Sequence, residues 1–373
     1  MSIIIFIIIL LVLVVSHEFG HFIVAKKSGI RVDEFSFGFP PKLFGKKIGE
    51  TTYNFNALPL GGYVKIYGQG SDDFPGQNGE EVTEADKERS FMHKPRYIQA
   101  AVLFAGVFMN LLVAWLLLSV GFISGLPTSV GSVPKGGVVE NQALTITSVL
   151  GGSPAEIGGL KTGDKILSLE TIDDSTKLLS SELGTESVQS FVKANSGKEI
   201  KVSLIRGKEQ KEVTVVSELN DNGSAVIGIS MDTIGTMKLP VHLAVWEGLK
   251  LTGDVTKATV VGFYNLIKSA ILGKADMSTL TGPVGIVGVV GDAAEFGFIY
   301  LLSFTALISI NLAVINLVPF PALDGGRLLF LLIEKIKGSR IKPQIANWVN
   351  MIGFGLLMLL MVVITYHDIL KLL

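Results

Sequence analysis

The chain has 373 residues, of which 48% are hydrophobic and only 17% are charged, and its mean hydropathy is +0.51. Soluble domains carry about 25% charged residues, so this composition is typical of a membrane protein. A formal net charge of -1 gives no basic surface for nucleic acid, and the absence of cysteine excludes disulfides and cysteine-ligated zinc sites.

Long apolar runs predict an α-helical polytopic membrane protein with about four transmembrane helices, at 1–27, 97–125, 298–318 and 344–370. Lysine and arginine concentrate in the two short connections, 28–96 and 319–343. Because positive residues favour the cytoplasm, both connections are expected there and both termini are expected outside. The first run has no preceding basic residue and exceeds a signal-peptide core in length, so we expect a retained span.

The first span carries His17-Glu18-Phe19-Gly20-His21, an H-E-x-x-H motif. On a helix, residues four apart share a face, so the two imidazoles can hold one Zn²⁺ and Glu18 can act as a base. Three ionisable residues near the end of a membrane span are costly to bury, which argues against a chance match. The predicted orientation places the motif toward the cytoplasmic side.

The connection 28–96 combines two kinds of sequence. Alternating apolar and polar residues over Tyr53–Tyr67, around Pro59-Leu60-Gly61-Gly62, predict a short β-hairpin. The acidic, glycine-rich stretch Gly70–Ser90 predicts a flexible loop. In the second span, Asn110 by itself indicates a hydrogen bond between helices rather than a functional site.

A soluble domain is expected at 128–231, inserted between the second and third spans and therefore extracytoplasmic. Its strand-like runs are Leu144–Val149, Lys165–Leu169, Glu199–Ile205 and Glu212–Val216, with a helix starting at Ser153-Pro154. The run SVLGGSPAEIGGLKTGDKILSLE resembles a PDZ domain, which implies capture of an extended or C-terminal peptide by strand addition. The alternative is a small β-domain that only packs.

Two further segments follow this domain. The stretch 240–273 predicts a helix whose charged residues share one narrow face, as expected for a helix lying in the membrane interface. Thr281-Gly282-Pro283-Val284-Gly285 predicts a tight turn, and the role of Gly282–Gly291 stays open.

The third span ends in Asn316-Leu317-Val318-Pro319-Phe320-Pro321-Ala322-Leu323-Asp324-Gly325. Taken alone, Asp324 could be a helix N-cap. The predicted topology puts it on the same side as His17 and His21, where it would complete a His₂-carboxylate zinc site with one open position.

Together, H-E-x-x-H in the first span and N-x-x-P-x-P-x-L-D-G at the end of the third resemble the site-2 protease family of intramembrane zinc metalloproteases, peptidase M50. The PDZ-like insert resembles the bacterial branch that acts in regulated intramembrane proteolysis. The resemblance covers essentially the whole chain. One departure is visible, because Gly106-Val107 stands where family members often have Gly-Pro.

The resemblance implies a zinc cofactor bound by His17, His21 and Asp324, with Glu18 as the catalytic residue. It also implies a membrane-associated β-hairpin that presents substrate in extended form, and it places substrate-binding residues at Asn316, Asn110, Gly61, Gly62 and Tyr63.

The implied activity is hydrolysis of peptide bonds within membrane-spanning segments, in the bacterial cytoplasmic membrane. Expected partners are single-span membrane proteins, such as anti-sigma factors or signal-peptide remnants, a peptide ligand of the PDZ domain, and the bilayer, without nucleic acid. A metal-ion transporter and a catalytically silent PDZ scaffold are the alternatives. Neither explains the complete motif with its glutamate.

Overall fold

The computed structural model describes residues 1–69, 83–132, 137–173, 176–179, 182–220, 223–273 and 281–372. Most of the loop expected at Gly70–Ser90 lies outside these residues. The chain divides into two compact units. The helical unit comprises Met1–Leu117, Leu249–Gly291 and Thr305–Leu373, and the β-rich unit comprises Leu118–Gly248 and Asp292–Phe304.

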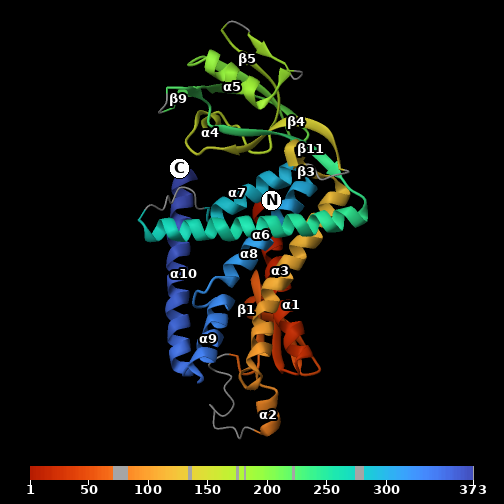
Figure 1. Ribbon diagram of the computed structural model, residues 1–373, viewed down its shortest axis with the longest axis vertical. Coiled ribbons are helices and arrows are strands. Elements are labelled where there is room, and N and C mark those ends of the chain that lie inside the picture. Colours follow the sequence, from red (N-terminus) through yellow and green to blue (C-terminus); the bar gives the residue numbers. More distant parts are fainter. Residues whose placement is uncertain are drawn as a thin grey trace. The chain divides into compact units, whose positions relative to one another are not determined.

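Long apolar helices form most of the helical unit (Figure 1). The larger helices of the chain are α1 Ser2–Lys27, α3 Arg96–Ser124, α6 Val241–Ile271, α7 Pro283–Phe296, α8 Phe298–Leu317, α9 Asp324–Lys337 and α10 Pro343–Leu372. In the described part of the chain, α1, α3, α8 and α10 are long and apolar enough to cross a membrane. Four spanning helices were expected, and the described residues contain four candidates.

A two-stranded sheet of β1 Val32–Ile48 and β2 Thr51–Ile66 follows α1. The first half of β1 lies between the two ends of β2, because Phe35 pairs with both Val64 and Tyr53. The prediction of a hairpin confined to Tyr53–Tyr67 is therefore wrong, since β2 continues through this segment and pairs with β1. Alternation identifies a strand, but it does not identify the partner of that strand.

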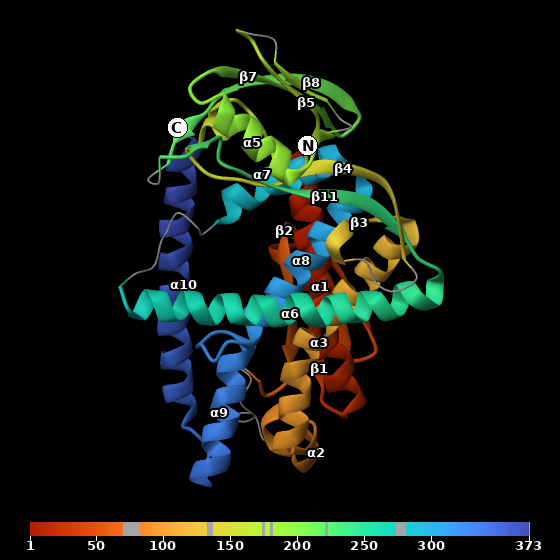
Figure 2. The same ribbon diagram turned by 45° about the horizontal axis from the view of Figure 1, so that its top comes forward.

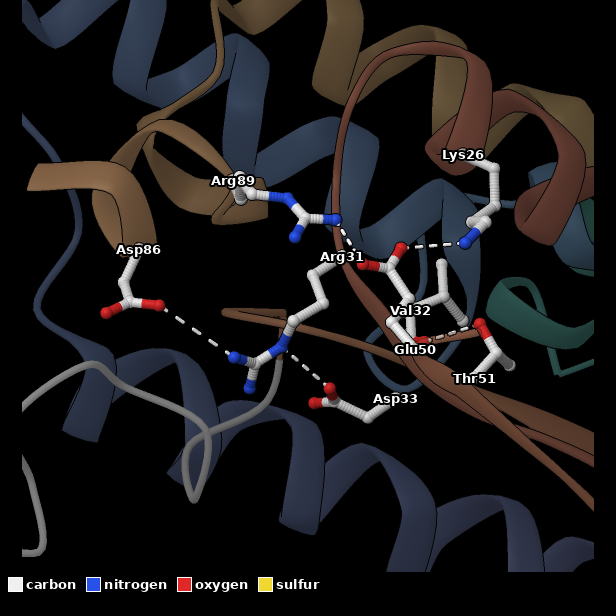
Figure 3. Close-up of polar contacts among 8 residues, drawn as sticks. All are labelled: Lys26, Arg31, Val32, Asp33, Glu50, Thr51, Asp86 and Arg89. Carbon is white, nitrogen blue, oxygen red and sulfur yellow. Dashed lines mark hydrogen bonds and ion pairs between the residues drawn. The ribbon is translucent and has the colours of Figure 1, made fainter. Parts of the chain in front are cut away.

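The turn between β1 and β2 is connected by ion pairs to the end of α1 and to the segment before α3. Figure 3 shows Lys26 and Arg89 both reaching the carboxylate of Glu50. In the same view Arg31 points to Asp33, with Nε 2.8 Å from Oδ1. Exposed pairs contribute about 0–1 kcal/mol each, so this cluster orients the sheet more than it stabilises it.

The short elements before α3 are α2 Glu84–Glu88 and a 3₁₀ turn at Phe91–His93. Buried apolar residues from α1, the sheet, α3 and the segments that connect them form one core cluster of Ala25, Ile30, Val32, Ile66, Phe91, Val102 and Leu103. This packing positions β2 against α1, which is the helix that carries the H-E-x-x-H motif.

The β-rich unit contains an antiparallel sheet in the order β3-β11-β4-β5-β7-β8, with β6 paired to β5. The strands are β3 Leu126–Ser129, β4 Val138–Val149, β5 Lys165–Thr171, β6 Lys177–Leu178, β7 Glu199–Arg206, β8 Glu209–Val216 and β11 Ile229–Lys238. A separate pair consists of β9 Glu218–Leu219 and β10 Ala225–Val226. The expected strands are present, but β11 was missed, and it extends past the expected boundary at 231.

Two helices accompany this sheet. The short α4, Pro154–Ile157, begins where the sequence predicted, with the Ser153 side chain accepting a hydrogen bond from the Glu156 amide. The longer α5, Thr185–Ala194, lies along the sheet (Figure 2) and contributes Val188, Phe191 and Val192 to the core. A short 3₁₀ turn at Val130–Ser132 follows β3.

The tight turn expected at Thr281–Gly285 is instead the start of α7. Pro283 is the first helical residue, a position that proline favours because its missing N–H would be unpaired there anyway. The carboxylate of Asp368, near the end of α10, accepts hydrogen bonds from the amides of Gly282 (3.1 Å) and Gly285 (2.8 Å). A cap supplied by a residue more than eighty positions away leaves no local sequence signal.

Candidate functional site

Two histidines of α1 and the first residue of α9 converge in the helical unit. Nε2 of His17 lies 3.0 Å from Oδ2 of Asp324, and Nε2 of His21 lies 3.3 Å from the same oxygen. The two Nε2 atoms are 3.1 Å apart. Both histidines are buried, and within the described ranges these three residues are the group whose donor atoms could share a metal ion.

The three donor atoms fit a tetrahedral metal. Ligands bonded at about 2.0–2.1 Å to a tetrahedral Zn²⁺ lie roughly 3.3 Å from one another, close to the observed separations. Two imidazoles and a carboxylate also form a ligand set that catalytic zinc uses, with a fourth position left for water or substrate. The geometry and the chemistry of the donors therefore both suit zinc.

Gly106 of α3 leaves room beside these atoms. A Cβ built on Gly106 would lie 2.5 Å from Nε2 of His21 and 2.7 Å from Nε2 of His17. Gly20 on α1 likewise faces the α3 backbone, since its Cβ would lie only 2.3 Å from the carbonyl oxygen of Ala105. Two glycines thus let the helices approach closely where the donor atoms meet, as small residues commonly do in membranes.

The outer ring nitrogens of both histidines face α3. Nδ1 of His21 lies 2.8 Å from the carbonyl oxygen of Val102. Nδ1 of His17 lies 3.4 Å from Nδ2 of Asn110. Groups that contact the outer nitrogen of a histidine fix the orientation of its ring, so α3 determines how both imidazoles point.

Glu18 projects from α1 toward β2. Its Oε2 accepts a hydrogen bond of 3.1 Å from the backbone amide of Val64, which holds the carboxylate beside the two histidines. The group faces a cavity of about 450 Å³ that is lined by His17, Glu18, His21 and Asp324 together with other polar residues. A carboxylate in this position can accept a proton from a water molecule in the cavity.

The structure places the expected substrate-binding residues unequally. Asn110, Asn316, Gly62 and Tyr63 line the cavity, whereas Gly61 is absent from its described lining. A Cβ built on Gly61 would lie 3.0 Å from the ring of Phe39 and 3.4 Å from Val14, two residues that do line the cavity.

Two polar side chains in the lining were missed from the sequence, those of Gln69 and Arg327. Arg327 follows Asp324 by three residues on α9, so helical spacing could have indicated that it shares a face with the carboxylate. Gln69 lies three residues after the end of β2 and has no comparable sequence signal. Both also line an adjoining cavity of about 510 Å³ between the ends of α3, α9 and α10, so the two cavities meet at these side chains.

Comparison with known proteins gives the family. The family model described as peptidase family M50 matches residues 5–360, and the chain belongs to that family. A Clostridium perfringens protein whose name includes the words zinc metalloprotease is 36% identical over 358 residues, covering 96% of this chain and 95% of its own length. The regulator of sigma-W protease RasP of Bacillus subtilis is 32% identical, covering 100% of this chain and 99% of its own length.

Among solved structures, the PDZ domain of the SdrC-like protein from Listeria monocytogenes matches 25% of this chain and 92% of its own length. The identity is 18% and the TM-score is 0.20.

Proposed function

We propose that this multi-pass membrane protein hydrolyses peptide bonds inside the membrane-spanning segments of other proteins, as a zinc metalloprotease. The observation that carries the proposal is that two buried histidines and a glutamate, on a helix apolar enough to span a bilayer, meet an aspartate at the start of α9. A metal-ion transporter would have no need for a carboxylate held beside the metal ligands as a base, and a silent scaffold would have no need for the ligands.

In this proposal His17, His21 and Asp324 hold the zinc through Nε2, Nε2 and a carboxylate oxygen. Gly106 has no side chain, and this leaves the space that the two imidazoles need beside α3. When bound, zinc supplies the Lewis acidity that makes water nucleophilic near neutral pH and stabilises charge developing on the scissile carbonyl oxygen.

Glu18 is the proposed general base and then general acid. Its carboxylate takes a proton from the attacking water and delivers it to the leaving nitrogen of the scissile peptide. The hydrogen bond from the Val64 amide keeps one carboxylate oxygen fixed, so that the other is free to face the cavity. The same amide connects the proposed base to the strand that is expected to present the substrate.

A transmembrane substrate must unwind before it is cut, because helical carbonyls are engaged in hydrogen bonds. We propose that the end of β2 near Gly62 and Tyr63 binds the unwound segment as an added strand. Asn316, which lines the same cavity from α8, is proposed to hydrogen-bond the substrate backbone. Gly61 would act indirectly, by allowing the backbone conformation of β2, since its φ of 155° is unusual for other residues.

The β-rich unit is proposed to be a PDZ domain. A cavity of about 680 Å³ lies between α5 and the β10–β11 region, and its lining includes Val188, Val192, Gly228 and Ile229. In the described chain, Ile229–Thr233 of β11 pairs with β4 alone, because β3 pairs only from Ile234 onward. An extended peptide can add to that open edge.

The charge distribution supports placing this unit outside the cytoplasm and the zinc ligands toward the cytoplasmic side. In that arrangement the unit cannot contact the scissile bond. It would instead exclude substrates whose external part is still bulky. The sigma-W regulation named for the Bacillus subtilis relative supports membrane-bound anti-sigma factors as one substrate class, with signal-peptide remnants as another.

The experiment compares wild type with Glu18→Gln on a single-span model substrate in liposomes, and zinc is counted in both proteins. We expect both to hold about one zinc and the variant to cleave at least ~100-fold more slowly. Glu88→Gln, an exposed change on α2, is the matched control and should cleave normally.

Cleavage by Glu18→Gln at the wild-type rate would refute its role as the base. If zinc-loaded wild type fails to cut even a pre-trimmed substrate, the protease proposal itself is refuted. Zinc flux into the liposomes that persists without cleavage would support the transporter instead.

A further inference from the structure

Asn110 has an unusual environment for a mid-membrane asparagine. Its side chain is 1% exposed, and its backbone carbonyl accepts a 2.7 Å hydrogen bond from the Ser309 hydroxyl of α8, which fixes this turn of α3. Its Nδ2 lies 3.4 Å from Nδ1 of His17, whereas its buried Oδ1 has no hydrogen-bond partner in the described structure. The amide is therefore aimed at a proposed metal ligand, with its acceptor unused.

The tautomer required for metal binding determines which hydrogen-bond partner Nδ1 of His17 needs. A neutral histidine that binds a metal through Nε2 carries its proton on Nδ1, and that N–H must be given an acceptor. For His21 the acceptor is present, because its Nδ1 lies 2.8 Å from the Val102 carbonyl oxygen. For His17 the group within reach is the Asn110 amide, and this amide carries an oxygen as well as a nitrogen.

A half-turn of the amide brings the oxygen to the histidine. The two ends of an asparagine side chain have nearly the same size and shape, so the exchange requires no movement of α3. After it, Oδ1 gains a donor and Nδ1 of His17 gains an acceptor. One rotation therefore gives a hydrogen-bond partner both to Oδ1 of Asn110 and to the Nδ1–H of His17.

We propose that Asn110 is a positioning residue that accepts the Nδ1–H of His17 and so holds its Nε2 toward the metal. This inference rests on the proposed function, because it requires zinc at His17, His21 and Asp324. It replaces the expected substrate-binding role of Asn110. Asn316 lines the same cavity and has no described contact with either histidine, so the substrate role remains with Asn316.

The test measures zinc affinity by competition with a chelator, in detergent, on the full-length protein. Asn110→Leu keeps the size of the side chain but removes the acceptor, and it should weaken zinc binding by about 10–100-fold, as loss of such outer contacts does. Asn110→Asp restores an acceptor and should bind zinc within about threefold of wild type or more tightly, because a carboxylate is a common partner for a zinc-binding histidine.

The control is Asn316→Leu, which should raise KM for the model substrate and leave zinc affinity unchanged. Thermal unfolding and gel filtration of each variant verify that it folds. Zinc affinity of Asn110→Leu within threefold of wild type would overturn the inference, and a raised KM there would return Asn110 to substrate binding.

Equal weakening in Asn110→Leu and Asn110→Asp would also overturn the inference, since it would indicate packing rather than an acceptor. Wild-type protein that binds no zinc would refute the proposed function, and this inference with it. The two failures are thus distinguishable.

Discussion

Replacing Gly106 by alanine is expected to destroy the zinc site although it substitutes none of the proposed ligands. The added Cβ would lie 2.5 Å from Nε2 of His21 and 2.7 Å from Nε2 of His17, where ordinary contact begins near 3.4 Å. The imidazoles must therefore retreat by about 0.7–0.9 Å, whereas zinc–nitrogen bonds tolerate about 0.2 Å. We expect zinc affinity to fall by about 100-fold or more, beyond the usual loss of one outer contact.

The assay is metal analysis of the purified protein together with cleavage of the model substrate. Gly106→Ala should hold well below one zinc per chain and show no measurable cleavage. Gly355→Ala in α10 is the matched control, because its Cβ meets nothing within 4 Å, and it should match wild type in both measurements. One tightly held zinc and a normal rate in Gly106→Ala would refute the reasoning about the space beside the histidines.

Two further predictions concern stability. Asp164 is fully buried and its oxygens lie 2.7 Å from Nε and from a terminal nitrogen of Arg206, so Asp164→Asn leaves a largely buried guanidinium without its counter-charge. We expect a loss of about 3 kcal/mol, seen as roughly 100-fold faster amide exchange in the core of the β-rich unit. Partial burial raises the pKa of Glu50, but hydrogen bonds from Lys26 and Arg89 outweigh it and lower the pKa below the ordinary 4.5. The stabilisation from these pairs should therefore be complete above about pH 4.5 and disappear as the pH falls through the lower folded value, with an amplitude of at most ~1 kcal/mol.

Matched variants check both predictions. Glu212→Gln removes an exposed pair with Lys201 in the β-rich unit and should leave amide exchange nearly unchanged. Glu50→Gln should reduce the acid-dependent loss of thermal stability by up to ~1 kcal/mol, whereas Glu88→Gln should leave it unchanged. Unchanged exchange in Asp164→Asn, or an acid dependence that Glu50→Gln leaves undiminished, would contradict the corresponding prediction.

The sequence by itself predicted the four spanning helices, because runs of twenty or more apolar residues have few stable places outside a bilayer. It also predicted that His17 and His21 share a face, since helical spacing alone ensures this. Two features with no local signal were not predictable. The pairing of β1 with both ends of β2 depends on contacts along a strand pair, and the cap on α7 comes from Asp368 in another helix.

The tertiary structure alone decided how close the parts of the site come. Proximity of Asp324 to His17, 307 residues earlier, could be proposed from topology, but the 3.0 Å separation depends on how α1 packs against its neighbours. In the sequence, Gly106 only matches the first residue of the family's Gly-Pro pattern, from which Val107 departs. Its function as the space beside two imidazoles became visible from packing. Packing likewise brings the side-chain amide of Asn110, a residue that lines the cavity, to 3.4 Å from Nδ1 of His17. A one-dimensional pattern records which chemical groups are present, whereas distances of a few tenths of an ångström arise from the contact of whole helices.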